Sequence, residues 1–250
     1  MLAPLMASLV GLAVGSFLNV VITRLPRDES LISRRSRCPS CGVTLAWRDN
    51  VPILSYLILK GRCRTCGAPI PWRYPLVEGL SGGLALALWL KFPAHPLLLA
   101  YGPFAAILVT LTFLDLEHFW IPDRITYPGI FLGLTLSLVL PSLSFKGALL
   151  GAVLGGASFY LLAQIYRLLT GQEGLGGGDV KLMALIGSFL GVRALPWVVL
   201  ISALLGSWVG LLVAWKSGKG ARTPIPYGPF LGAAALIYLF WQEKFSSWGP

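Results

Sequence analysis

Two aspartates lie beside apolar segments in a chain that has few acidic residues. Asp179 follows three consecutive glycines in GLGGGDVKL at 174–182, and Asp115 ends the apolar run LVTLTFLD at 108–115. A carboxylate at the edge of a membrane segment is costly and indicates a functional site. Two carboxylates at close range repel each other and can share one proton. Such a pair can do acid–base chemistry, because one carboxylate activates water while the other protonates or polarises a carbonyl group.

The glycines before Asp179 give a second indication of a site. Glycine lets one backbone approach another closely, so Gly176 and Gly178 would allow an extended substrate to lie against this loop. Lys181, close behind in the sequence, could orient the Asp179 carboxylate. The run is neither a Walker A loop nor a dinucleotide fingerprint, since the Gly-Lys-Ser/Thr ending and a preceding strand are both missing. A structural interpretation stays open, in which Asp179 only caps the helix that follows.

All four cysteines lie in one loop, as two C-x-x-C pairs. The segments CPSCG at 38–42 and CRTCG at 63–67 leave 21 residues between the pairs. Paired C-x-x-C turns supply the four thiolates that a tetrahedral zinc ion needs. Two disulfides compete with this interpretation if the loop faces an oxidising compartment, and a redox dithiol is a weaker alternative. We predict a structural zinc site formed by Cys38, Cys41, Cys63 and Cys66.

The elements that must position these residues are membrane helices, as the composition indicates. Hydrophobic residues make up 56% of the 250 residues, charged residues make up 12%, and the mean hydropathy is +0.75. A soluble domain has about twice this charged fraction. The first apolar run lacks a charged n-region and a clear cleavage site, so we expect a retained helix rather than a signal peptide. Stretches long enough to cross a bilayer predict eight helices, at 2–23, 76–93, 97–114, 125–141, 147–168, 180–193, 195–215 and 226–242.

The positive charges predict the orientation of these segments. With both termini outside, the loops in the cytosol are 24–75, 115–124, 169–179 and 216–225. These loops and their margins contain sixteen of the twenty Lys and Arg residues, ten of them in the first loop. Because Lys and Arg gather in cytosolic loops, we expect Asp115, Asp179 and the cysteines on the cytosolic side. The reducing cytosol disfavours disulfides there.

The basic residues of the first loop indicate which kind of partner, nucleic acid or lipid, this loop binds. In a soluble protein, a net charge of +10 together with a zinc knuckle would indicate nucleic acid. Here the arginines are better explained by anionic lipid headgroups, to which each contributes about 1 kcal/mol near the surface. We therefore predict the lipid bilayer, and no nucleic acid, as a partner of this loop.

Several segments, in order along nearly the whole chain, form a specific set. They are GSFLNVVITRLP at 15–26, the two C-x-x-C pairs, RYPLVE at 73–78, LDLEHFWIPD at 114–123, GLGGGDVKL at 174–182 and TPIPYGPFL at 223–231. The set resembles the bacterial type IV prepilin peptidases, or leader peptidase/N-methyltransferases, which are membrane aspartyl proteases of the G-x-G-D class. Here that motif is Gly176-Gly177-Gly178-Asp179. Its second position is glycine where an aromatic residue is more usual, which could make the loop more flexible.

The resemblance implies an enzyme with two activities. As a membrane aspartic endopeptidase, it would use Asp115 and Asp179 to cut the basic leader from type IV prepilins and type II secretion pseudopilins, after a glycine on the cytosolic side. It would then methylate the new N-terminal residue with S-adenosylmethionine, although no motif of the chain marks a site for this methyl donor. The resemblance also implies a cytosolic zinc-binding loop and a location in the bacterial inner membrane. Glu78 could bind basic residues of the leader or pair with Arg73.

Together these patterns predict an all-α polytopic membrane protein, with about eight transmembrane helices and a small cytosolic zinc-binding insertion. We expect a first helix at 1–23, a zinc-binding loop at 24–75 and a peptidase domain of several helices at 76–250. Two other classes of function stay open. A transporter would use Asp115 and Asp179 as a proton relay, but it would place them near the bilayer midplane and show an internal repeat. A membrane-anchored zinc module would depend on its cysteines and little on either aspartate.

Overall fold

The structure is a computed structural model that describes residues 2–32, 36–140, 144–172, 174–217 and 225–246. Within these residues the chain is α-helical, with two isolated β-bridges and no named strand. The predicted all-α class is therefore confirmed. Some residues used in the sequence argument lie outside this description: Arg34, Arg35, Lys219 and Arg222 from the charge count, and Thr223 and Pro224 from the TPIPYGPFL segment.

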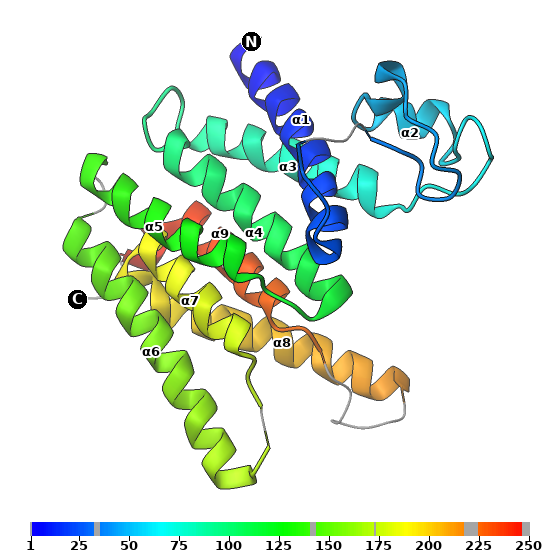
Figure 1. Ribbon diagram of the computed structural model, residues 1–250. Helices are drawn as coiled ribbons and strands as arrows, with labels where there is room; N and C mark the ends of the chain where they lie inside the picture. The colour runs from blue at the N-terminus through cyan, green and yellow to red at the C-terminus, as the bar shows by residue number, and fades with distance from the viewer. Residues whose placement is uncertain (1, 33–35, 141–143, 173, 218–224, 247–250) are drawn as a thin grey trace. The chain divides into compact units, whose positions relative to one another are not determined.

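Each of the eight predicted apolar segments forms a helix (Figure 1). The boundaries agree with the prediction to within a few residues, because Pro, Gly and charged residues interrupt the apolar runs at these points. A further short helix, α2 (Leu54–Ile58), lies in the cysteine loop. The long helices are α1 (Leu2–Arg24), α3 (Arg73–Lys91), α4 (Leu98–His118), α5 (Asp123–Val139), α6 (Phe145–Thr170), α7 (Gly177–Leu190), α8 (Leu195–Ser217) and α9 (Gly228–Ser246).

Four helical segments of the described chain are long and apolar enough to cross a membrane. They are Leu2–Arg27, Leu98–His118, Phe145–Thr170 and Val192–Lys216. These helices agree with the predicted membrane protein, whereas the count of eight spans stays a prediction. Helices α5 and α7 have only 17 and 14 residues, and a helix needs about 20 residues to cross a bilayer.

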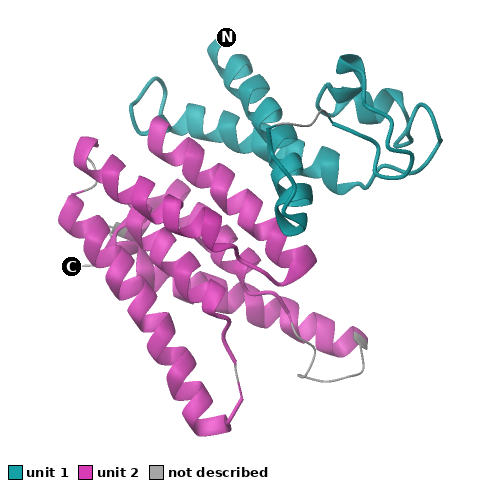
Figure 2. Cartoon of the chain, viewed as in Figure 1, with its two compact units in different colours: residues 1–98 teal, residues 99–250 magenta. Residues whose placement is uncertain are grey.

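The chain divides into two compact units, residues 1–98 and 99–250 (Figure 2). In the first unit, α1 packs against α3. Glycine makes this close packing possible, because a Cβ added at Gly15 of α1 would lie 2.7 Å from the Glu78 Cα and 2.9 Å from the Ser81 Cβ of α3. The cysteine loop connects these two helices.

Two knuckles of similar geometry form the cysteine loop. The backbone N–H of Gly42 donates to the Cys38 carbonyl, and that of Gly67 donates to the Cys63 carbonyl, each at 2.9 Å. Both glycines have left-handed backbone angles, with φ of 71° at Gly42 and 70° at Gly67. Residues with a Cβ rarely adopt these angles. The glycine that follows each C-x-x-C pair is therefore needed to turn the chain back on itself.

In the second unit, α7 is the most deeply buried helix, and it packs on α5, α6 and α9. At Gly151 of α6 and Gly187 of α7, a Cβ on either residue would overlap the backbone of the other helix. Phe104 of α4 stacks on Phe189 of α7, with ring centroids 4.6 Å apart. A helix surrounded in this way is apolar on all faces. The packing also fixes the N-terminal end of α7, where Asp179 lies.

Candidate functional site

Asp115 lies in the last turn of α4 and is buried, with 6% of its surface exposed. Its Oδ2 accepts a hydrogen bond of 2.9 Å from the backbone N–H of Gly228, at the start of α9. The approach requires glycine, because a Cβ at Gly228 would lie 2.7 Å from Oδ2. A backbone donor therefore holds this carboxyl group in place.

Asp179 lies in the first turn of α7 and is 8% exposed. The N-cap of α7 is Gly176, and the N–H of Asp179 donates to the Gly176 carbonyl at 3.1 Å. The interpretation of Asp179 as the helix cap is therefore wrong, since this residue lies inside the first turn. Its Oδ2 would be 3.5 Å from a Cβ placed on Gly176, so the carboxyl group lies beside the glycine run.

The structure brings the two aspartates together in the second unit. Ile121, between α4 and α5, connects their surroundings: a Cβ at Gly178 would lie 2.8 Å from the Ile121 Cβ, and one at Gly228 would lie 3.2 Å from its Cδ1. The carboxyl groups of Asp115 and Asp179 are close enough to interact electrostatically. Both are buried, so their interaction is weakly screened by solvent. The arrangement can share a proton, as acid–base catalysis by a carboxyl pair requires.

Sequence reasoning did not identify Gly228, Ile121, Tyr227 or Ser202 as parts of this site. Tyr227 directly precedes Gly228, and its hydroxyl lies 2.8 Å from the Ser202 Oγ in a hydrogen bond. Tyr227 also interacts electrostatically with Asp179. The resemblance had marked the segment TPIPYGPFL, which contains Tyr227 and Gly228, without giving any residue a role. Ile121 likewise lies in the marked segment LDLEHFWIPD, again without a role. Ser202 carries no signal in a single sequence, because it acts only through a neighbour that the fold supplies.

Lys181 contacts a different acidic residue from the one expected. Its Nζ forms an ion pair with Asp123, the first residue of α5, and lies 5.6 Å from the centroid of the Tyr127 ring. These contacts tie the first turn of α7 to the start of α5. The role of Lys181 in orienting Asp179 stays a prediction.

Glu78 lies in the first unit, on α3, and is 7% exposed. Its Oε2 accepts a hydrogen bond of 2.7 Å from the backbone N–H of Ile53. Ile53 has a positive φ of 60°, which is strained for a β-branched residue. The Glu78 carboxylate thus holds the turn that precedes α2.

The four cysteine thiols form a cluster in which all the sulfur atoms lie within 4.8 Å of one another. They are free thiols, and Cys38 Sγ lies 3.8 Å from Cys66 Sγ. Sulfur atoms bound to a tetrahedral zinc ion at about 2.3 Å are about 3.8 Å apart, whereas a disulfide bond measures about 2.05 Å. The cluster therefore fits a four-coordinate zinc ion.

Hydrogen bonding favours metal binding by this cluster. The backbone N–H of Cys41, followed by that of Ser40, lowers the pKa of the Cys38 thiol to about 6. The backbone N–H of Ala68 lowers the pKa of Cys66, but partial desolvation and the three neighbouring thiols outweigh it and raise this pKa to about 12. Without a cation, neighbouring thiolates repel one another, so some of the four thiols keep their protons. A divalent cation would stabilise all four as thiolates.

In a comparison with known protein families, each half of the chain matches a family model. Residues 9–92 match the bacterial peptidase A24 N-terminal domain, and residues 102–211 match the type IV leader peptidase family. The first match contains the four cysteines, and the second contains Asp115 and Asp179. No solved structure gives a significant match.

Curated relatives cover nearly the whole chain. A prepilin leader peptidase/N-methyltransferase of Burkholderia pseudomallei is 41% identical, over 96% of this chain and 85% of the relative. Proteins with the same name from Myxococcus xanthus and Aeromonas hydrophila are 42% and 39% identical, over 93% and 96% of this chain and 70% and 91% of the relatives. The chain belongs to the type IV leader peptidase family.

Proposed function

We propose that this protein is a membrane aspartic endopeptidase that also methylates its product. It removes the basic leader from type IV prepilins and type II secretion pseudopilins, by a cut after glycine on the cytosolic side. It then N-methylates the new N-terminal residue. The observation that carries the proposal is the buried pair formed by Asp115 and Asp179, in a chain whose relatives are named prepilin leader peptidase/N-methyltransferase.

The buried pair can hydrolyse a peptide bond without a covalent intermediate. One carboxylate takes a proton from water, and the water oxygen attacks the carbonyl carbon of the glycine that precedes the cut. The other carboxyl group donates a hydrogen bond, and then a proton, to the substrate, so that the C–N bond breaks and the amine leaves neutral. The N–H of Gly228 holds Asp115 in position through this cycle, and the backbone at 176–178 offers a surface for an extended substrate.

The second activity requires S-adenosylmethionine, which supplies an activated methyl group to the new amine. The cysteine cluster would hold zinc through Cys38, Cys41, Cys63 and Cys66. In this role the metal joins the two knuckles and stabilises the loop around them. Glu78 would act in the same unit by fixing the turn at Ile53.

The expected location is the bacterial inner membrane, in contact with its lipids. Eight spans with both termini outside would place Asp115, Asp179 and the cysteine loop on the cytosolic side, in keeping with the positive charges of the loops. A cysteine in place of Pro96, between the predicted spans 76–93 and 97–114, or in place of Gln172, which follows α6, would report the side by its labelling with an impermeant maleimide. We expect labelling of whole cells outside at the former position only.

Cleavage of a synthetic prepilin by the purified protein in detergent tests the proposed function. The substrate has a basic leader and a Gly-Phe junction, and product masses are read with and without S-adenosylmethionine. We expect one cut after glycine, and the added mass of one methyl group only when the donor is present. No cleavage, together with proton uptake by vesicles that contain the protein, would instead support the proton relay.

The two last glycines of the G-x-G-D motif should differ in their tolerance of a side chain. Gly178→Ala places a methyl group against the Cβ of Ile121, whereas no neighbouring atom of the described residues lies within 4 Å of a Cβ at Gly177. We expect Gly178→Ala to lower kcat/KM for cleavage by about a hundredfold, since misplacing a catalytic group by about 1 Å has this effect. Gly177→Ala is the matched control and should stay within about twofold of the wild type. Equal activity of the two variants would contradict the contact with Ile121.

A further inference from the structure

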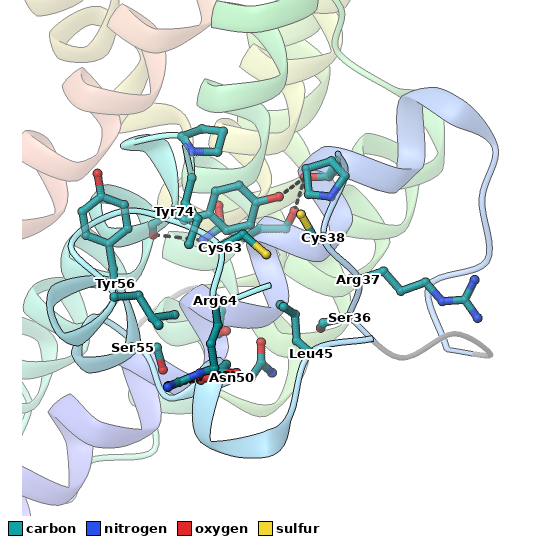
Figure 3. Close-up of a pocket in the computed structure, with 18 of the residues that line it drawn as sticks. Ser36, Arg37, Cys38, Leu45, Asn50, Ser55, Tyr56, Cys63, Arg64 and Tyr74 are labelled. Atoms are coloured by element: carbon teal, nitrogen blue, oxygen red, sulfur yellow. Dashed lines mark hydrogen bonds and ion pairs between the residues drawn. The ribbon is translucent and has the colours of Figure 1, made fainter. Parts of the chain in front are cut away.

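A cavity of about 190 Å³ lies in the first unit, among α1, the start of α3 and the cysteine loop. Tyr56, Tyr74, Cys63 and Arg64 surround it, whereas the guanidinium of Arg37 points away from the others (Figure 3). Liquid water occupies about 30 Å³ per molecule, so the space corresponds to at least about six waters. It is therefore larger than the space a metal ion needs and can accept part or all of an organic molecule.

Helix α1 presents polar side chains to this cavity. Ser16, Asn19 and Thr23 line it at spacings of three and four residues, which places them on one face of the helix. The Asn19 Nδ2 donates to the Tyr74 carbonyl at 3.0 Å, but its Oδ1 has no hydrogen-bond partner among the described residues. Asn19 is only 1% exposed. A buried acceptor without a donor is unfavourable, so Oδ1 marks a position where a bound molecule can supply a donor.

Carboxylates and aromatic rings complete the lining. Glu78 and Asp49 line the cavity, and Asp49 forms an ion pair of 2.7 Å with Arg64. Tyr56 and Tyr74 add aromatic surface. Carboxylates bind sugar hydroxyls, and both carboxylates and aromatic faces attract cations. The lining thus suits a cationic molecule that contains a sugar and several hydrogen-bond donors.

S-adenosylmethionine has these groups. Its sulfonium centre is a cation, which suits the carboxylates and aromatic rings of the lining, and its ribose and amino groups are hydrogen-bond donors. We propose that this cavity of residues 1–98 binds S-adenosylmethionine, with Asn19 Oδ1 accepting a hydrogen bond from it and Tyr56 contacting it. The inference rests on the methyltransferase activity proposed above, to which it adds a site.

The cysteine cluster shapes one wall of this site. Cys38 and Cys63, the buried members of the cluster, line the cavity together with residues of both knuckles. Folding of the knuckles around a metal would therefore form the wall, while the metal itself stays outside the reaction. Binding of the methyl donor should accordingly depend on an intact cluster.

Binding of the methyl donor to variants of the full-length protein tests this assignment. Asn19→Leu removes the unpaired acceptor at similar volume, and Tyr56→Leu removes an aromatic ring of the wall. The matched control is Ser81→Ala. Ser81 is also buried, and its hydroxyl has no hydrogen-bond partner in the described part of the chain, but it lies against Gly15 and outside the cavity lining. Affinity is measured by equilibrium dialysis with tritiated S-adenosylmethionine and by calorimetry with S-adenosylhomocysteine. Leader cleavage is measured on the same preparations.

We expect Asn19→Leu and Tyr56→Leu each to weaken binding of both compounds at least tenfold, with cleavage and the Ser81→Ala variant within twofold of the wild type. If Asn19→Leu does not fold, as its melting temperature will show, Tyr56→Leu decides alone, since Tyr56 lies in the loop and not in the α1–α3 interface. Folded variants that bind the donor as tightly as the wild type would overturn the site while leaving the methyltransferase proposal intact. A wild type that cleaves but neither binds the donor nor transfers methyl would refute both.

Discussion

Replacement of Asp115 or Asp179 by asparagine should abolish leader cleavage while leaving the protein folded. Either change removes the carboxyl group that takes or gives a proton at one side of the pair, and acid–base catalysis contributes about 10²–10⁴-fold to a rate. Because the two carboxyl groups act as a unit, the double variant should be no slower than the single ones. The measurement is the single-turnover rate of cleavage of the synthetic prepilin, with product masses read directly.

Two controls show whether the loss of cleavage is due to loss of a catalytic group or to a general structural defect. Glu117→Gln removes an exposed carboxylate two residues beyond Asp115, on the same helix end, and should keep full activity. A substrate that already lacks the leader should still be methylated by both aspartate variants, since the donor site is proposed in residues 1–98. If both variants cut as fast as the wild type, the aspartates have a structural role and the proposed mechanism is wrong.

Loss of one cysteine from the cluster should unfold the knuckles and stop methyl transfer. Zinc binding contributes about 10–16 kcal/mol to the folding of small zinc-dependent peptides, far more than the packing within a short loop can replace. Cys41→Ser should therefore abolish zinc binding, which is expected at one ion per chain in the wild type. Limited proteolysis should then cut within residues 36–72, and binding of S-adenosylmethionine should fall at least tenfold.

Ser40→Ala is the matched control for this loss. Ser40 is exposed between the two cysteines of the first knuckle, and its side chain is not a ligand. This variant should keep its zinc content, its resistance to protease and its methyl transfer. A Cys41→Ser protein that retains one zinc ion and binds the donor normally would show that the cluster does not hold the metal.

The sequence was a sufficient guide to where the helices are, but not to how many cross the membrane. Long apolar runs and their interruptions located all eight long helices, because helix formation follows local pattern. Helix α7 shows why the count of spans is harder. Most of its 14 residues are apolar and packed among other helices, and burial inside a protein favours the same apolar pattern as contact with lipid. The boundary of the zinc-binding loop at 24–75 stays a prediction.

The sequence predicted the reactive groups of the candidate site, but not the residues that hold these groups in position. Asp115, Asp179 and the cysteines stand out by residue type and spacing, since costly groups are few in an apolar chain. The bond from Gly228 to Asp115 joins residues 113 positions apart, and no local pattern encodes such a contact. The same holds for the cavity, where the unpaired oxygen of Asn19 becomes visible only once its surroundings are known.

The division of the chain near residue 98 has a consequence for how such proteins can evolve. All residues assigned here to cleavage come from 99–250, and all those assigned to the metal and the methyl donor come from 1–98. Selection can therefore act on either activity with little interference from the other. A lineage that no longer needs a methylated product could lose the cysteines, or the whole first segment, and retain every residue of the carboxyl pair and its supports. Comparison of gene architectures would reveal such losses as chains that keep the G-x-G-D segment without the paired C-x-x-C motifs.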